Sequence, residues 1–278
     1  MLTLELVFAV LFGLAFGSFL NVCISRLPRH ASIALPPSHC PRCHAPIAAR
    51  DNVPLVSFFL LRGRCRRCGW RIPWRYPFVE MATAILTAAC VLGFGATLHG
   101  CALAIFCTLL LALAVCDVET LLLPDTLTLP LLTLGLVFRA ISGYLAGCPL
   151  GFAEGSRQAL ATAARGALSA ALAAAALWLV GWLYARVRHR TGMGLGDVKL
   201  AAAIATWVGA RQMLVVFFLA VAVGAVTGAA LLLLRRRRGF TWQEPQMLPF
   251  GLFLAFAGIY CAFAGAATLD WYLGFFPS

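Results

Sequence analysis

Charged side chains are scarce in this sequence, and acidic ones are the scarcest. Of 278 residues only 12% are charged and only ten are Asp or Glu, whereas 62% are hydrophobic. A soluble domain usually has about 25% charged and about 45–50% apolar residues. So few charges cannot cover a water-exposed surface, which excludes a soluble globular enzyme, and the apolar content excludes a disordered chain.

Lysine is almost absent as well. The chain carries 22 basic side chains against ten acidic ones, for a net charge of +12, and Lys199 is the single lysine. A strongly basic chain often binds nucleic acid. The apolar composition nevertheless makes a membrane protein the first possibility to test, because each spanning helix needs about 20 mainly apolar residues.

Seven stretches are long and apolar enough to cross a bilayer as helices. They cover residues 4–24, 77–95, 100–116, 126–146, 166–185, 213–234 and 249–269. An eighth apolar piece, 198–209, is shorter, and at about 1.5 Å per residue it falls short of a ~30 Å hydrocarbon core. The first stretch has no basic segment before it, unlike a cleaved signal peptide. The pattern predicts an all-α polytopic membrane protein with about eight transmembrane helices.

The basic residues are concentrated in three segments. Residues 25–76 hold ten of them, and residues 186–199 and 235–238 hold four each, which together make 18 of the 22. If all eight apolar pieces cross, the three segments share one side, and the positive-inside rule makes that side cytoplasmic. Both termini then lie on the opposite side. We therefore expect 198–209 to cross, in a bilayer that thins or admits water beside it.

This distribution explains the net charge without a nucleic-acid partner. Arginines in cytoplasmic loops orient the spans and contact anionic headgroups. Membrane lipids, and no nucleic acid, are therefore the expected partners of the basic surface.

Four of the eleven cysteines form two CxxC pairs, Cys40 with Cys43 and Cys65 with Cys68. Two such pairs predict a tetrahedral zinc site in residues 25–76, in a compartment where disulfides rarely persist. Four thiolates close the coordination shell, so the zinc is predicted to be structural. A neighbouring histidine, His39 or His44, is the alternative ligand. With few aliphatic residues between the pairs, the loop is expected to need the metal to fold.

Three aspartates stand at the predicted membrane edge, where an ionisable group is costly and commonly functional. Asp117 follows the stretch 100–116, Asp125 precedes 126–146 and Asp197 precedes 198–209. On the predicted topology all three lie at the cytoplasmic side. Two close carboxylates share one proton, so one acts as a base on water while the other acts as an acid. That chemistry suits hydrolysis of a peptide bond.

Local structural roles are the alternative for these acids. Asp125 follows Pro124 and is favoured as a helix-capping residue, and Asp197 has the same option. Three glycines precede Asp197: Gly192, Gly194 and Gly196. They leave room for a peptide backbone beside the carboxylate. Glu80, at the start of the second stretch, is expected to pair with Arg75.

Several motifs occur in one order along nearly the whole chain. They are Gly17-Ser18-Phe19-Leu20-Asn21-Val22, Arg26-Leu27-Pro28, the two CxxC pairs with Asn52-Val53-Pro54 between them, Arg75-Tyr76-Pro77-Phe78-Val79-Glu80, Leu123-Pro124-Asp125, Gly192-Met193-Gly194-Leu195-Gly196-Asp197 with Lys199-Leu200, and Pro249-Phe250-Gly251. In this order the sequence resembles the type IV prepilin peptidases, which are bifunctional leader peptidases and N-methyltransferases.

The resemblance implies an intramembrane aspartyl protease of the GxGD type in the bacterial inner membrane. The family's catalytic aspartates match Asp117 and Asp197, with Gly194, Gly196 and Asp125 in support. The implied substrates are prepilins and pseudopilins, cleaved after a glycine at the cytoplasmic face. The new N-terminal residue is then methylated, with S-adenosylmethionine as the methyl donor. The chain has no Rossmann-like glycine fingerprint, so the donor's site is expected only at the cytoplasmic surface, near the zinc loop.

Three parts are therefore expected: a first transmembrane helix at 1–24, a four-cysteine zinc loop at 25–76 that is assigned to methyl transfer, and a membrane peptidase domain at 77–278. In that arrangement Asp51, Glu80 and Glu119 are the acidic candidates to receive a basic leader peptide. Two other hypotheses stay open. In the first, the chain is only a peptidase and the zinc loop is a scaffold. In the second, it is a membrane scaffold or a transporter whose acidic residues interact with ions.

Overall fold

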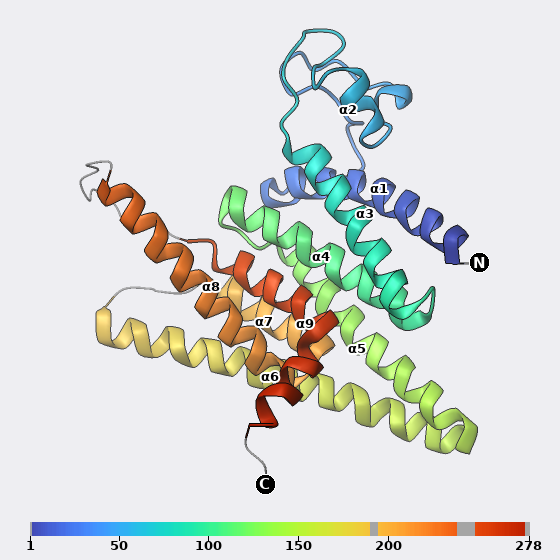
Figure 1. Ribbon diagram of the computed structural model, residues 1–278, viewed down its shortest axis with the longest axis vertical. Coiled ribbons are helices and arrows are strands. Elements are labelled where there is room, and N and C mark those ends of the chain that lie inside the picture. The colour runs from blue at the N-terminus through green and yellow to red at the C-terminus, as the bar shows by residue number, and fades with distance from the viewer. Residues whose placement is uncertain (1, 190–193, 238–247, 276–278) are drawn as a thin grey trace. The chain divides into compact units, whose positions relative to one another are not determined.

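The computed structural model describes residues 2–189, 194–237 and 248–275 (Figure 1). Within these ranges every regular element is a helix, and the only strand-like pairings are two isolated bridges. The predicted all-α fold is confirmed. Gly192, Arg190 and Arg238, which belong to the glycine motif and the basic segments described above, lie outside the described residues.

Within the described ranges, seven helices are long and apolar enough to span a membrane, so the chain is a multi-pass membrane protein. They are α1 (Leu2–Arg26), α3 (Arg75–Phe94), α4 (Leu98–Thr120), α5 (Asp125–Gly147), α6 (Phe152–Arg188), α8 (Ala210–Arg237) and α9 (Phe250–Leu273). Five of them contain a predicted stretch in full, and α3 and α9 each leave out one terminal residue of theirs. Helix α7 (Leu195–Val208) covers the short eighth piece in 14 residues, and its crossing stays a prediction.

One predicted span lies in a helix that is much longer than the span itself. The span expected at 166–185 lies inside α6, which begins at Phe152 and has 37 residues. Hydropathy falls off before residue 166 because Glu154, Arg157 and Arg165 lie there, but alanines continue the helical conformation. At about 1.5 Å per residue, α6 extends well beyond a ~30 Å hydrocarbon core.

The chain forms two compact units, Met1–Cys116 and Asp117–Ser278. In the first unit α1 packs along α3, and two glycines four residues apart make the close approach possible. A Cβ atom at Gly17 would lie 2.8 Å from the Cα atom of Glu80, and one at Gly13 would lie 2.7 Å from that of Ala84. This small-xxx-small pattern is typical of membrane helix pairs. It brings the end of α1 beside the start of α3.

In the second unit α5 packs on α6 and α7, and α8 packs on α9. The α5–α6 contact again uses glycines. A Cβ atom at Gly147 would lie 2.9 Å from the Cα atom of Gly155 and 3.0 Å from the Gln158 side chain. The indole of Trp207 donates a 2.8 Å hydrogen bond to the carbonyl of Leu131, which ties α7 to α5.

Side chains from neighbouring helices form hydrogen bonds with the backbone groups at the end of α7 and the start of α8. Arg139, inside α5, donates from Nε to the carbonyl of Thr206 and from Nη2 to that of Trp207 at 3.1 Å. The hydroxyl of Ser169 accepts the N–H of Ala210 at 3.2 Å. Helix ends carry unsatisfied backbone groups, and unsatisfied groups are especially costly in lipid. These bonds therefore permit a helix as short as α7.

Candidate functional site

The loop between α1 and α3 contains the same turn twice. The N–H of Cys40 donates to the carbonyl of Ala45, and the equivalent N–H of Cys65 donates to that of Trp70, both within 3.0 Å. An isolated antiparallel bridge flanks each turn, His39 with Pro46 and Arg64 with Arg71. Each turn presents two thiols in the same way, so we call these two turns the knuckles.

The four knuckle sulfurs meet. The Sγ atoms of Cys40, Cys43, Cys65 and Cys68 all lie within 4.8 Å of one another, and those of Cys40 and Cys68 are 3.8 Å apart. Tetrahedral thiolates at about 2.3 Å from a zinc ion would be separated by roughly 3.8 Å. The cluster could therefore hold a metal ion. Among the described residues no histidine joins it, and the Nδ1 atom of His39 instead lies 3.0 Å from the carbonyl oxygen of Pro37.

Backbone donors prepare one of these thiols for metal binding. The N–H groups of Cys68 and Arg67 point at the sulfur of Cys65 and lower its pKa to about 7. A thiol must lose its proton to become a metal ligand. The knuckle backbone therefore favours the ligating form near neutral pH.

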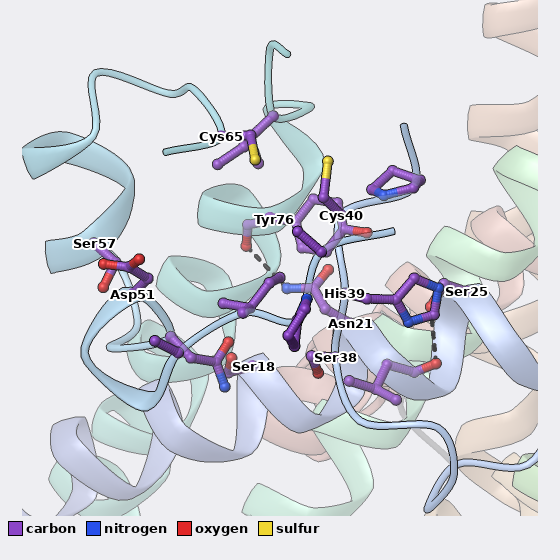
Figure 2. A pocket seen from close by; sticks show the side chains of 18 of the residues that line it. Ser18, Asn21, Ser25, Ser38, His39, Cys40, Asp51, Ser57, Cys65 and Tyr76 are labelled. Carbon is purple, nitrogen blue, oxygen red and sulfur yellow. Dashed lines mark hydrogen bonds between the residues drawn. The ribbon is translucent and has the colours of Figure 1, made fainter. Parts of the chain in front are cut away.

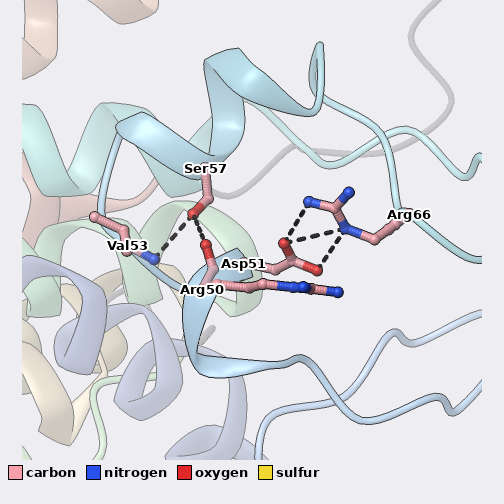
Figure 3. A network of polar contacts seen from close by, with 5 residues as sticks. All are labelled: Arg50, Asp51, Val53, Ser57 and Arg66. Carbon is pink, nitrogen blue, oxygen red and sulfur yellow. Dashed lines mark hydrogen bonds and ion pairs between the residues drawn. The ribbon is translucent and has the colours of Figure 1, made fainter.

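A polar network holds the segment between the knuckles (Figure 3). The Arg66 guanidinium donates to the Asp51 carboxylate from Nη2 at 2.7 Å and from Nε at 2.9 Å. These bonds lower the pKa of Asp51 below its ordinary value. Nearby, Ser57 Oγ donates to the carbonyl of Arg50 at 3.1 Å and accepts the N–H of Val53 at 3.0 Å. Asp51 thus has a cationic partner already.

Asp117 lies in the last turn of α4 and is only 5% exposed. Its Oδ2 atom accepts the backbone N–H of Leu252 at 3.0 Å, and the N–H of Gly251 also donates to the carboxylate. Both donors belong to the first turn of α9, where N–H groups have no partner within the helix. A helix N-terminus is a natural site for a carboxylate, so α9 holds Asp117 in a fixed orientation.

Asp197 lies in the first turn of α7, and its side chain accepts the N–H of Gly194, the residue that precedes the helix. This resembles the return contact of a capping box. Asp197 therefore makes the helix-capping contact that was the structural alternative for this residue. The carboxylates of Asp197 and Asp117 are also near enough for their charges to repel each other. The two aspartates therefore lie close enough to interact electrostatically, and their joint catalytic role stays a prediction.

Leu123 connects the two glycine-containing motifs around these acids. A Cβ atom at Gly196 would lie 3.2 Å from the Cβ atom of Leu123, and one at Gly251 would lie 3.0 Å from its Cδ1 atom. The same Cβ at Gly251 would lie 2.9 Å from Oδ2 of Asp117. Only glycine fits at Gly251 without displacing the carboxylate.

Asp125 lies in the first turn of α5, as expected of an acidic residue at a helix start, but its side chain makes no capping bond there. The residue before the helix is Pro124, and no side-chain capping bond is found at this helix end. Instead both oxygens of Asp125 accept hydrogen bonds from Lys199 Nζ at 2.8 Å. Lys199 is two residues beyond Asp197, so the pair ties the start of α5 to the end of α7 that carries Asp197.

Glu80 also departs from its expected role. Within the described residues it forms no ion pair with Arg75. Its Oε2 atom accepts the N–H of Leu55 at 2.8 Å, and the residue is 8% exposed. Glu80 is buried because the loop between α1 and α3 contacts its side chain. Gly17 also lets α1 pack closely against the backbone of Glu80.

Sequence reasoning missed the donors to Asp117 and the contacts of Arg139. The sequence predicts no role for Pro249-Phe250-Gly251 and none for Arg139. The one available signal was the glycine after a proline at the start of an apolar stretch. It indicates close backbone approach but not which residue approaches.

Two protein families match consecutive parts of the chain. The family described as "Bacterial Peptidase A24 N-terminal domain" matches residues 11–94. The family described as "Type IV leader peptidase family" matches residues 104–229. The first range contains both knuckles, and the second contains Asp117 and Asp197.

Curated relatives are similar over nearly the whole chain, and each is named "Prepilin leader peptidase/N-methyltransferase". The relative from Aeromonas salmonicida (strain A449) is 36% identical, over 95% of this chain and 92% of its own length. The one from Burkholderia pseudomallei (strain 1026b) is 37% identical, over 94% and 86%. The one from Pseudomonas aeruginosa is 35% identical, over 96% and 92%. No solved structure matches the chain.

Proposed function

The chain belongs to the type IV leader peptidase family, and from this we propose that it removes the leader peptides of type IV prepilins and type II secretion pseudopilins and then methylates the new N-terminal residue. The names of its relatives state both activities. The observation that carries the peptidase proposal is the approach of Asp117 to Asp197 at the ends of α4 and α7.

In this proposal one member of the dyad, Asp117 and Asp197, acts as a base and the other acts as an acid. Two close carboxylates share one proton. Asp117, which accepts two N–H groups of α9, keeps the negative charge and takes a proton from the attacking water. Asp197 holds the shared proton and gives it to the departing amine as the peptide C–N bond breaks and a C–O bond forms. Gly194 leaves space for the substrate backbone, Gly196 lets Leu123 pack against α7, and Asp125 supports α7 through Lys199.

Methyl transfer makes a different demand on the protein. Attack by a neutral amine on a methyl group needs positioning and a water-poor site more than an acid or base. S-adenosylmethionine supplies the methyl group when bound. We assign this activity to the knuckle loop, which the first family match includes.

We assign zinc to the four-cysteine cluster. Its sulfur spacing suits a tetrahedral ion, and four thiolates leave no open coordination position for chemistry. The metal's role is therefore structural: it joins the two knuckles and shapes the loop between α1 and α3.

The proposed location is the bacterial inner membrane, with the dyad and the knuckles at the cytoplasmic face. The support is the distribution of arginine, which puts 18 of 22 cations on that face. Reporter fusions at Arg211, in the first turn of α8, test the topology. A periplasmic signal is expected there, and a cytoplasmic signal would contradict the crossing of α7.

The peptidase assignment is tested with Asp117→Asn and Asp197→Asn, each made separately in the full chain. Cleavage of a prepilin in membranes should fall by about a thousand-fold or more in each, because each removes the acid or the base. Asp270→Asn, an exposed aspartate at the end of α9, is the matched control and should cleave normally. Full-rate cleavage by either dyad variant would refute the assignment and favour a scaffold or transporter.

The transferase assignment is tested by mass spectrometry of the processed substrate's N-terminus. A mass increase of one methyl group supports the bifunctional enzyme. A cleaved but unmethylated amine, with donor present, would leave a peptidase whose zinc loop is a scaffold.

A further inference from the structure

A cavity of about 560 Å³ lies between the knuckle loop and the helices α1 and α3 (Figure 2). Ser18 and Asn21 line it from α1 and Tyr76 from α3, while Cys40 and Cys65 line it from the two knuckles. The volume falls in the range of small-molecule sites, about 300–1,000 Å³. Because both knuckles form its wall, the metal cluster determines the shape of this cavity.

The floor of the cavity carries a buried acceptor that has no donor. Asn21 is 2% exposed, and its Nδ2 atom donates to the carbonyl of Tyr76 at 3.0 Å. That bond fixes the amide's orientation, since the opposite one would set two oxygens against each other. The Oδ1 atom is buried and has no hydrogen-bond partner in the part of the chain that the structure describes. Buried acceptors are nearly always paired, so this oxygen indicates a donor that comes from a ligand.

A buried carboxylate lines the same floor. Glu80 is 8% exposed and accepts hydrogen bonds from the N–H of Leu55 and from the side chain of Ser18. Among the described residues no cation pairs with it. A buried charge is normally paired, so Glu80 and Asn21 together favour a cationic, donor-rich group in the cavity.

The open side of the cavity has the opposite charge. Arg29 and Arg50 line it and are exposed. Arg26 also lines it and donates from both terminal nitrogens to the carbonyls of Ser32 and Pro36, at 2.9 and 2.7 Å. A guanidinium is the preferred partner of a carboxylate. The cavity therefore suits a molecule with a cationic part and a carboxylate.

Apolar and aromatic side chains complete the lining: Val22, Ile47, Phe58 and Trp70. These side chains offer a surface for a planar ring system, which would be held there by stacking and apolar contact. The required ligand thus combines a flat ring system, cationic groups and a carboxylate.

We propose that this cavity binds the methyl donor S-adenosylmethionine, with Asn21 and Glu80 receiving its cationic groups and the exposed arginines its carboxylate. The inference rests on the proposed methyltransferase function and deepens it, because it gives that function a site. The proposal also requires the knuckles to be folded, because they form the wall of the cavity opposite α1.

The test measures binding directly, without turnover. Radiolabelled S-adenosylmethionine is titrated by equilibrium dialysis against the full-length, metal-loaded protein in lipid nanodiscs. Glu80→Gln keeps the oxygen that accepts the Leu55 N–H but loses the charge, and should raise Kd at least ten-fold. Glu5→Gln, in the first turn of α1 and far along that helix from the cavity, is the matched control and should bind as the unmodified chain does.

Ultraviolet cross-linking of the labelled donor to the unmodified chain gives a second readout that no variant's folding can disturb. Label in peptides spanning residues 18–29 or 76–80 supports the site. Label confined to peptides that do not line the cavity overturns it.

The outcomes separate the two proposals. If the unmodified chain binds no donor, the methyltransferase function itself fails. If it binds the donor, and Glu80→Gln binds equally well, the function stands and the site is wrong. If Glu80→Gln instead weakens only the binding of a processed pilin peptide with a free amine, the cavity receives the methyl acceptor and the proposal is also wrong.

Discussion

The backbone N–H of Leu252 donates a 3.0 Å hydrogen bond to Oδ2 of Asp117. The first turn of α9 thereby binds a carboxylate from the last turn of α4, at a point where helix N–H groups would otherwise lack partners. The contact explains a motif that had no chemical role in the sequence, and it gives one member of the dyad a fixed position.

Gly251→Ala should slow cleavage about 10- to 100-fold, mainly in kcat, because a small displacement of a reacting group has effects of this size. The new Cβ atom would lie 2.9 Å from Oδ2 of Asp117 and must push the carboxylate away. Peptidase kinetics in membranes measure the effect. Gly93→Ala in α3, where nothing lies within 4 Å of the new atom, is the control. Equal rates for Gly251→Ala and the unmodified chain would mean that α9 does not position Asp117.

Arg139→Met should destabilise the second unit by about 3 kcal/mol, since buried charge-assisted hydrogen bonds contribute roughly 1.5–3 kcal/mol each. The change leaves the carbonyls of Thr206 and Trp207 without these donors at the end of α7. Thermal unfolding of the purified protein measures it. Arg157→Met, whose 4.0 Å pair with Glu154 is on the surface, should change stability little. An unchanged midpoint for Arg139→Met would contradict the capping role.

Cys43→Ser should abolish stoichiometric metal binding, because a tetrahedral thiolate site tolerates the loss of a ligand poorly. The unmodified chain is expected to retain about one zinc ion per chain through purification. Metal analysis by mass spectrometry measures this directly. Cys148→Ser removes an exposed cysteine outside the cluster and should leave the metal in place. An unchanged zinc content in Cys43→Ser would contradict the assignment of zinc to the four-cysteine cluster.

Cys65 should be alkylated early when the metal is removed, because the turn that donates to its sulfur is local and is expected to persist when the rest of the loop unfolds. Backbone donors lower the pKa of this thiol to about 7, so half of it is the reactive thiolate near neutral pH. An ordinary thiol, with a pKa of about 8.5, is mostly protonated there. Peptide mapping after iodoacetamide treatment from pH 6 to 9 should give a Cys65 rate that levels off above about pH 8. A rate that still rises steeply up to pH 9 would contradict the lowered pKa.

Much of the site was predictable because the relevant signals are local. CxxC spacing sets two thiols on one turn, so the spacing alone is enough to predict Cys40 and Cys65 as metal ligands. Asp117 and Asp197 stood out because acids are rare in this chain and both border apolar stretches. Glu80 could not be assigned correctly, because its neighbour in sequence, Arg75, is not its partner in space. The partner of Asp125 could not be predicted for the same reason, since Lys199 lies on another helix.

The sequence by itself determined the helical membrane fold and the two knuckles, and it predicts an arginine-rich face and an acidic pair. Each follows from composition or from spacing within one turn or one span, where the free energy of placing a side chain in water or lipid depends on the residue itself. Tertiary structure alone decided that α9 binds Asp117, that Arg139 ends α7 and that Asn21 and Glu80 share a cavity floor. Those contacts join helix ends far apart in the chain, and they depend on which glycine faces let helices approach.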